Sequence, residues 1–445
     1  MFVYEYGPHD NRPNNGVASV DVTLTNLSNL TVTCVVRFYA FNNTAGAQTP
    51  SIYGSQIITL SPFGNGASTY LIKNVPTATA FFGVKVSANN NEAELLRSVI
   101  TFNNALSQPV GSIPIPLISS MPKYAYIVNS GDDTLLVIDQ VTKQQVGGLI
   151  QLPLSSMPVD VALPYFSIYA FTANSNSLND SLILTDTRQL GLLPIGKESI
   201  AIDTDEPYAI RVFALNNDSP NSYVTVFDIT TNTQRPGSPI TVGDNAVALQ
   251  FVPSTERLYV ANKDDGTISV INTITNTVIT TIPLLPGVPN ASAPVHLAAS
   301  SNGKYIYVAA QGLPGEIQVI DGFTNTMLTP IPLLGIPSAS GLIPYRIALS
   351  PDDAALYVAS ANSSDLVSLN VHSPAKPALY RNVTMTGGPP EALAVTPDGS
   401  EVYIVNNWSS GSTVSILDRS TNSLLPVPIP TGFQPKSISF SNFIW

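Results

Sequence analysis

The sequence predicts an all-β protein, a small β-sandwich followed by a seven-bladed β-propeller that the C-terminal strand closes. Three observations support this prediction. A block of short β-rich runs recurs seven times after residue 122. The first 105 residues lack this block but alternate apolar and polar side chains between turns. The last residues supply an inner strand that the first block lacks.

The repeated block consists of an aromatic-led strand, a polar turn, and a second strand that ends in Asp or Asn. Its clearest copy is Leu258–Asn262 followed by Thr267–Asn272, with a Thr275-Asn276-Thr277 turn after it. The closing positions of the seven copies are spaced by 42 to 49 residues: Asp139, Asp186, Asp228, Asn272, Asp321, Asn370 and Asp418. A period in the forties built from short strands predicts the blades of a propeller.

The aromatic strand carries a short motif, seen in Tyr259-Val260-Ala261-Asn262 and in Tyr403-Ile404-Val405-Asn406. It resembles the YVTN family of bacterial and archaeal propeller proteins over roughly residues 120–445. The N-terminal region has a weaker likeness to sandwich modules of surface and spore-coat proteins of Gram-positive bacteria. The first resemblance implies a propeller, but the family includes surface-layer, adhesion-like and binding proteins and so implies no single function.

An alternating strand precedes each aromatic strand and is predicted to be the innermost strand of a blade. One position holds large aliphatic residues: Val161, Ile200, Val247, Leu297, Ile347, Leu393 and Ile438. The next holds small ones: Ala162, Ala201, Ala248, Ala298, Ala348, Ala394 and Ser439. Successive side chains on a strand point to opposite faces, so a large face of one blade is expected to meet a small face of the next.

The first aromatic strand, Lys123–Asn129, has no such inner strand before it, while Gln434–Phe440 follows the last block. The C-terminal strand is therefore predicted to complete the first blade and close the ring. The domain prediction is an extended arm at 1–15, a β-sandwich at 16–105, a Pro-rich linker at 106–122, and the propeller at 123–445.

Composition narrows the function. Charged residues make up 11% of the chain, and the net charge is −11 with an isoelectric point near 4.6, which argues against a nucleic-acid partner. No stretch has the length and apolar character of a membrane span. Cys34 is the single cysteine, so no disulfide is expected. No signal peptide is visible, yet the polar, uncharged composition favours an extracellular, cell-surface or spore-surface location.

Catalytic and metal-binding motifs are absent from the sequence, and the histidines His9, His296 and His372 are far apart. The paired carboxylates, such as Asp132-Asp133 and Asp352-Asp353, lie beside Gly or Pro and are expected to form turns. We therefore expect no catalytic residue, no metal, no cofactor and no enzyme activity.

One set of positions indicates a ligand site. In each inner strand, the position two residues before the small residue is occupied in turn by Asp160, Ser199, Ala246, His296, Arg346, Ala392 and Ser437. If these residues surround the propeller axis, Asp160, His296 and Arg346 meet at the channel mouth and could hold a small ligand or ion. The alternative is that they are solvated side chains at the starts of strands.

The favoured functional interpretation is a non-enzymatic structural surface protein that forms homo-oligomers or polymers. Phe2, Tyr4 and Tyr6 would lie on one face of the N-terminal arm, which could add as a strand to a neighbouring sandwich. The alternative for the arm is that it folds back on its own domain. The alternative function is a binding module for a glycan, peptide or matrix partner, and an enzyme is the third class.

Overall fold

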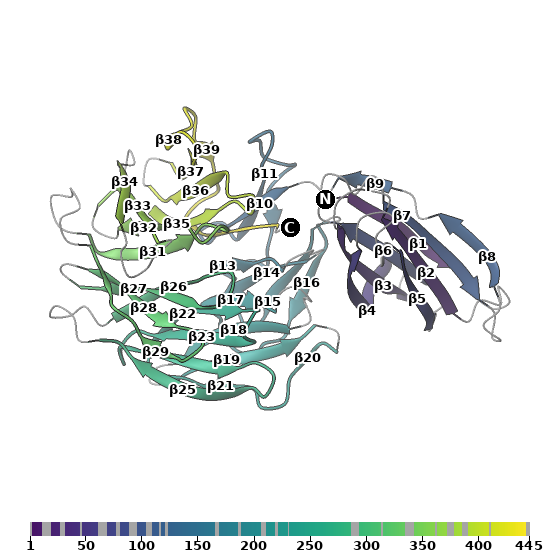
Figure 1. The fold of residues 1–445 in the computed structure, drawn as a ribbon, viewed down its shortest axis with the longest axis horizontal. Coiled ribbons are helices and arrows are strands. Elements are labelled where there is room, and N and C mark those ends of the chain that lie inside the picture. The colour runs from purple at the N-terminus through teal and green to yellow at the C-terminus, as the bar shows by residue number, and fades with distance from the viewer. Residues whose placement is uncertain are drawn as a thin grey trace. The chain divides into compact units, whose positions relative to one another are not determined.

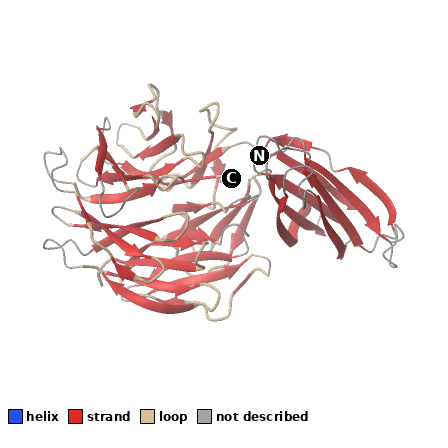
Figure 2. Ribbon diagram, in the orientation of Figure 1, coloured by secondary structure: helices blue, strands red, loops and turns tan. Residues whose placement is uncertain are grey.

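The computed structural model divides the chain into two units, residues 1–122 with 443–445 and residues 123–442. It describes residues 2–441 apart from 11–18, 27–31, 45–46, 61–68, 77–80, 89–95, 104–108, 115–116, 121–122, 165–168, 186–187, 206–210, 219–220, 230, 286–292, 313–314, 334–341, 361–362, 372–377, 385–389 and 409–410. Strands make up the regular structure of this part (Figure 2). It contains no helix long and apolar enough to cross a membrane.

The first unit has two antiparallel sheets, described by their backbone. The five-stranded sheet has the order β4 (Ala47–Leu60), β3 (Val32–Thr44), β6 (Phe81–Ala88), β1 (Phe2–Asp10) and β9 (Leu117–Ser120). The four-stranded sheet has the order β5 (Thr69–Pro76), β2 (Ser19–Asn26), β7 (Leu96–Asn103) and β8 (Pro109–Pro114). Leu24 of β2 is fully buried.

Both segments that flank the predicted sandwich carry strands. Phe2 and Tyr4 of β1 pair with Ala88 and Val86 of β6 on one side and with β9 on the other. This pairing corresponds to the alternative in which the arm folds back on its own chain. Within residues 106–122, β8 and β9 lie at the edges of the two sheets. Proline is tolerated at sheet edges, so a Pro-rich segment can form strands there.

The second unit is a seven-bladed propeller, as the sequence predicts, and each blade is an antiparallel sheet (Figure 1). Blade 1 consists of β40 (Pro435–Phe440), β10 (Tyr124–Asn129), β11 (Thr134–Asp139) and β12 (Ile150–Gln151). Blade 2 consists of β13 (Pro158–Ala162), β14 (Tyr169–Asn174), β15 (Asp180–Leu184) and β16 (Leu190–Leu193). Blade 3 consists of β17 (Ala201–Thr204), β18 (Arg211–Asp218), β19 (Asn221–Asp228), β20 (Thr233–Gln234) and β21 (Ile240–Thr241).

The other four blades follow the same order. Blade 4 consists of β22 (Ala246–Val252), β23 (Arg257–Asn262), β24 (Thr267–Asn272) and β25 (Thr277–Pro283). Blade 5 consists of β26 (Ala293–Ala299), β27 (Tyr305–Gln311), β28 (Glu316–Asp321), β29 (Thr326–Met327) and β30 (Ile331–Pro332). Blade 6 consists of β31 (Pro344–Leu349), β32 (Ala355–Ser360), β33 (Asp365–Asn370) and β34 (Ala378–Thr384), and blade 7 consists of β35 (Pro390–Val395), β36 (Glu401–Asn406), β37 (Thr413–Asp418), β38 (Ser423–Leu424) and β39 (Ile429–Pro430).

The predicted closure is confirmed. The C-terminal strand β40 pairs antiparallel with β10, with Ile438 opposite Ile127 and Phe440 opposite Ala125. Ile438 and Phe440 are buried, and the Phe440 ring packs edge-on against Tyr403 of blade 7 with centroids 5.1 Å apart. The last strand of the chain therefore completes blade 1 and joins it to blade 7.

The repeated Tyr and Asn have physical roles that blade 4 shows clearly. The fully buried Tyr259 donates its hydroxyl to the Gly322 carbonyl and to Asn325 Oδ1 of blade 5, each at 3.2 Å. Asn262 is also fully buried, and its Nδ2 donates to Thr267 Oγ1 and Ser269 Oγ at 2.9 Å. The tyrosine therefore links neighbouring blades, and the asparagine joins two strands within a blade. The predicted blade end at Asp186 lies outside the described residues.

Candidate functional site

The candidate site lies where the seven inner strands surround the propeller axis. Each of β13, β17, β22, β26, β31 and β35 contacts the next, and β40 contacts both β35 and β13. Six of these strands contain a register shift near their start, for example between Pro158 and Asp160 and between Pro294 and His296. Such β-bulges bend a strand and redirect the side chain that follows.

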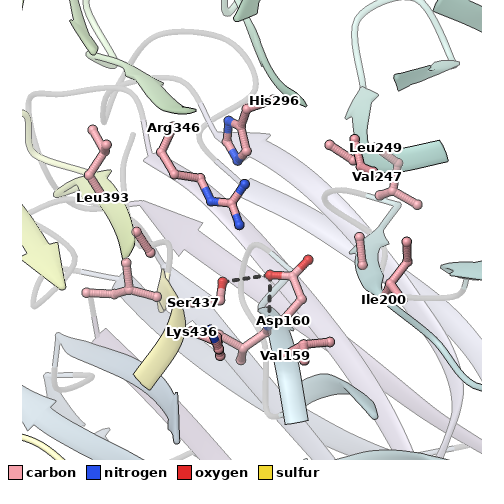
Figure 3. Close-up of a pocket in the computed structure, with 15 residues that line it drawn as sticks. Val159, Asp160, Ile200, Val247, Leu249, His296, Arg346, Leu393, Lys436 and Ser437 are labelled. Atoms are coloured by element: carbon pink, nitrogen blue, oxygen red, sulfur yellow. Dashed lines mark hydrogen bonds between the residues drawn. The ribbon is translucent and has the colours of Figure 1, made fainter. Parts of the chain in front are cut away.

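The side chains after the bulges, with Ala201 of blade 3, form a ring. In blade order from blade 1 its members are Ser437, Asp160, Ala201, Ala248, His296, Arg346 and Ala392. All seven line one cavity of about 170 Å³. The three residues predicted to meet at the channel mouth, Asp160, His296 and Arg346, thus line the same cavity (Figure 3).

The predicted ring is wrong in blades 3 and 4. Ser199 and Ala246 were expected there, but both are fully buried and the cavity is lined by Ala201 and Ala248. A shift of two residues preserves the alternation of faces along a strand, so the apolar pattern cannot detect it. The distance to the aromatic strand does detect it in blade 4, because Leu249 precedes Tyr259 by ten residues, as Leu297 precedes Tyr307.

The same shift changes the predicted small column. When the inner strands are aligned by the aromatic-strand residue that each position faces, Asp203 and Gln250 correspond to Ala162 and Ala298 of the other blades. Asp203 accepts hydrogen bonds from the backbone N–H groups of Phe251 at 2.7 Å and of Thr204 at 2.8 Å. Burial raises the pKa of Asp203 to about 7. The alternation of large and small faces is therefore interrupted in blades 3 and 4.

Asp160 is fixed in place by three hydrogen bonds. Ser437 Oγ donates to its Oδ1 at 2.6 Å, as does the Val161 N–H at 2.9 Å, and the Ile202 N–H donates to Oδ2 at 3.0 Å. Burial raises the pKa of Asp160 above its usual range, while these hydrogen bonds and the Arg346 charge act in the opposite direction. The result is a positioned carboxyl group that is more basic than an exposed aspartate.

His296 is neutral at physiological pH. Burial, and next the charge of Arg346, lower its pKa to about 3. The Ile347 N–H points to its Nδ1 at 3.5 Å, a long contact. A neutral imidazole that accepts at Nδ1 carries its proton on Nε2, so His296 can act as a hydrogen-bond donor without charge.

Arg346 supplies the positive charge of the ring. Its guanidinium lies 4.3 Å from the centroid of the Tyr345 ring, and in Figure 3 it extends beside His296 toward Asp160. No ion pair joins Arg346 to a carboxylate among the described residues. An arginine without an ion pair in this part of the chain suits an anionic ligand or a developing oxyanion.

The second cation at the cavity, Lys436, is neutralised. Its Nζ lies 2.9 Å from Glu391 Oε1 of blade 7. Sequence reasoning did not identify this pair, although both residues directly precede a ring position, Glu391 before Ala392 and Lys436 before Ser437. That shared offset in neighbouring blades is the signal that could have indicated it.

The turn carboxylates have structural partners. Asp133 accepts the N–H groups of Ser155 at 2.6 Å and Met157 at 2.8 Å, and Asp353 accepts the Ser301 N–H at 2.9 Å. Within the described part of the chain there is no group of three His, Cys, Asp or Glu side chains that could hold a metal ion. The paired carboxylates thus fasten loops, as the sequence predicts for turn residues.

Comparison with solved structures supports the propeller fold. The periplasmic gluconolactonase of Pseudomonas aeruginosa is 15% identical with a TM-score of 0.57, and the match covers 72% of this chain and 99% of that one. A putative 6-phosphogluconolactonase of Bacteroides uniformis is 16% identical with a TM-score of 0.58, covering 72% and 100%. Kuenenia stuttgartiensis hydrazine synthase is 15% identical with a TM-score of 0.55, covering 69% and 95%. No family model and no curated protein matches the chain.

These neighbours correct two expectations. The sequence favoured a non-enzymatic, self-assembling surface protein, but chains of this fold are named as lactonases and as hydrazine synthase. No comparison points to a structural or filament-forming role. The physical reason for the error is that a propeller site takes one side chain from each of several blades. A search for local catalytic motifs does not detect groups that are as far apart in sequence as Asp160 and Arg346.

Proposed function

We propose that the propeller is a hydrolase that opens a small lactone, the cyclic ester of a hydroxy acid, in the ring cavity. The observation that carries this proposal is Arg346, whose guanidinium enters the ring cavity without an ion-paired carboxylate among the described residues. The similarity of fold to chains named as lactonases supports it.

The first role in the reaction belongs to Arg346. Attack of water on the ester carbon places negative charge on the carbonyl oxygen. A guanidinium fixed near that oxygen stabilises the charge more strongly in a low-dielectric cavity than in water. The neutral His296 lies beside Arg346 and can donate a second hydrogen bond from Nε2 to the same oxygen.

The second role belongs to Asp160. As a carboxylate whose pKa is raised by burial, it can accept a proton from the attacking water. The C–O bond of the ring then breaks, and the leaving alkoxide takes up this proton to become the product hydroxyl. The product is a hydroxy acid whose carboxyl group loses the remaining proton of the water to solvent, and the carboxylate stays paired with Arg346 until release.

Hydrolysis of δ-gluconolactone by the full chain tests the proposal, with acid release followed above the spontaneous rate. We expect Arg346→Gln to lower kcat/KM by about 100-fold or more, as loss of an oxyanion donor does, and Asp160→Ala to lower kcat. Lys197→Gln is the matched control, because Lys197 is an exposed cation paired with Asp218 outside the cavity. Hydrolysis at the spontaneous rate, or a fully active Arg346→Gln variant, would overturn the proposal.

Further proposals rest on the sequence and not on the ring cavity. We infer from the motif that the repeat is of the YVTN type, and from the alternating strands that the two N-terminal sheets pack as a sandwich. Low charge content supports a location outside the cytosol, and homo-oligomerisation is kept as a proposal. Light scattering of the purified chain tests that last proposal. A monomer contradicts it.

A further inference from the structure

We infer that the lactone which this site accepts carries no phosphate group, because the ring supplies one cation with no ion pair among the described residues and places a carboxylate opposite it. This inference rests on the proposed function and specifies its substrate class. The site takes a neutral polyhydroxy lactone and discriminates against the phosphate monoester of the same lactone.

The first argument is the number of available cations. Lactone opening yields one carboxylate, which occupies Arg346. A phosphate monoester adds a further charge of nearly −2 at neutral pH and needs a second cationic partner. Lys436 is the other cation among the described lining residues, and its ammonium group already pairs with Glu391. Binding a phosphate would require that ion pair to break.

The second argument is the arrangement of the ring. His296 and Arg346 come from the adjacent blades 5 and 6, while Asp160 and Ser437 come from the adjacent blades 2 and 1. The two polar pairs are therefore separated by Ala201 and Ala248 on one side and by Ala392 on the other. The ester carbon of a bound lactone lies between Arg346 and Asp160, so a phosphate on the same molecule stays in a small cavity that also holds this carboxylate.

The third argument is the charge of Asp160 in the cavity. Asp160 is held by Ser437 and by the Ile202 N–H and cannot easily turn away. A carboxylate accepts hydrogen bonds from sugar hydroxyls but repels a phosphate dianion. The alanines between the polar pairs offer no side-chain donor to a phosphate. The chain's net charge of −11 adds a long-range barrier to a multiply charged anion.

Binding of the two reaction products separates this inference from the catalytic proposal. Isothermal titration with gluconate and with 6-phosphogluconate should show tighter binding of gluconate, by about tenfold or more. Glu391→Gln frees Lys436 and should raise the relative affinity for 6-phosphogluconate, and Asp160→Asn should do the same by removing the opposing charge. Asp218→Asn, which removes an equal charge at an exposed position, is the control that should leave the ratio unchanged.

The outcomes are distinguishable. If δ-gluconolactone is hydrolysed but 6-phosphogluconate binds as tightly as gluconate, the inference is wrong while the proposed function stands. An unchanged affinity ratio in both Glu391→Gln and Asp160→Asn also overturns it. If neither product binds and the lactone is not hydrolysed, the proposed function fails first and this inference fails with it.

Discussion

The turns at the ends of the blades use the same residue type from blade to blade, whereas the ring at the axis changes its residue type. In four blades the turn begins with an Asp or Asn whose side chain accepts the N–H groups two and three residues later: Asp139, Asn272, Asp321 and Asp418. The ring instead holds Ser, Asp, Ala, Ala, His, Arg and Ala in succession. A position that repeats does the same work in each blade and stabilises the fold. A position that varies from blade to blade is free to form a site.

The most severe test of this contrast is removal of the closing strand. Truncation after Phe433 deletes β40 and with it the buried Ile438 and Phe440. Each such side chain contributes about 1.5–3 kcal/mol, and the open edge of β10 adds to the loss. We expect a decrease of several kcal/mol in the free energy of unfolding, measured by urea denaturation. A truncated chain with the midpoint of the full chain would contradict the closure.

The next effect is expected at a place where one blade departs from the repeat. Asp180 of β15 takes the position that Ile268 of β24 and Val414 of β37 hold in their blades, as pairing with the aromatic strands shows. It is fully buried, its Oδ2 has no hydrogen-bond partner among the described residues, and burial raises its pKa to about 7. The folded state therefore binds a proton that the unfolded chain releases near pH 4.

Because the folded-state pKa of Asp180 is the higher one, its contribution to stability should be greatest below about pH 4 and should fall as the pH rises to about 7. Asp180→Val restores an aliphatic residue of the repeat and should reduce this dependence, with a gain on the order of a few kcal/mol at pH 8 and little gain at pH 4. The buried Asp203, whose pKa is also raised to about 7, keeps its own share of the dependence. Thermal unfolding across this range measures the difference between the two chains, with the exposed Asp218→Asn as the control. A difference in stability that does not grow from pH 4 to pH 8 would argue against a neutral buried Asp180.

A smaller loss is expected from overfilling a blade interface. Ala298 is 6% exposed and packs in the core shared by blades 5 and 6. Ala298→Leu should cost about 1–3 kcal/mol, whereas Thr281→Leu on the outer strand β25 should change stability by less than about 0.5 kcal/mol. Denaturation of the two variants side by side provides the measurement. Equal losses would mean that β26 is not an inner strand.

The smallest effect on stability should come from the ring. Arg346→Gln and His296→Gln remove groups that do not recur in the other blades, so each should shift the free energy of unfolding by less than about 1 kcal/mol. Both should nevertheless weaken gluconate binding. A ring variant that unfolds the propeller while a turn variant, Asn272→Ala, leaves it intact would reverse the assignment of site and scaffold.

The sequence by itself determined the features that rest on repetition. Seven copies of an aromatic strand predicted seven blades, and an unmatched inner strand at the C-terminus predicted the pairing of β40 with β10. Asp160, His296 and Arg346 were identified as cavity residues because they share one column of the repeat. These inferences hold because a repeated local pattern forms the same local structure in each copy.

Only the tertiary structure decided the register and the partners across the ring. Ala201 replaced Ser199 because alternation along a strand is unchanged by a shift of two residues, and only pairing with the aromatic strand fixes the offset in blade 3. In blade 4 the distance to Tyr259 could already have indicated the shift to Ala248. The neutralisation of Lys436 by Glu391 and the unpaired guanidinium of Arg346 depend on which blades are neighbours in space. Charge balance in the cavity is a property of the closed ring, because its members are contributed by strands hundreds of residues apart.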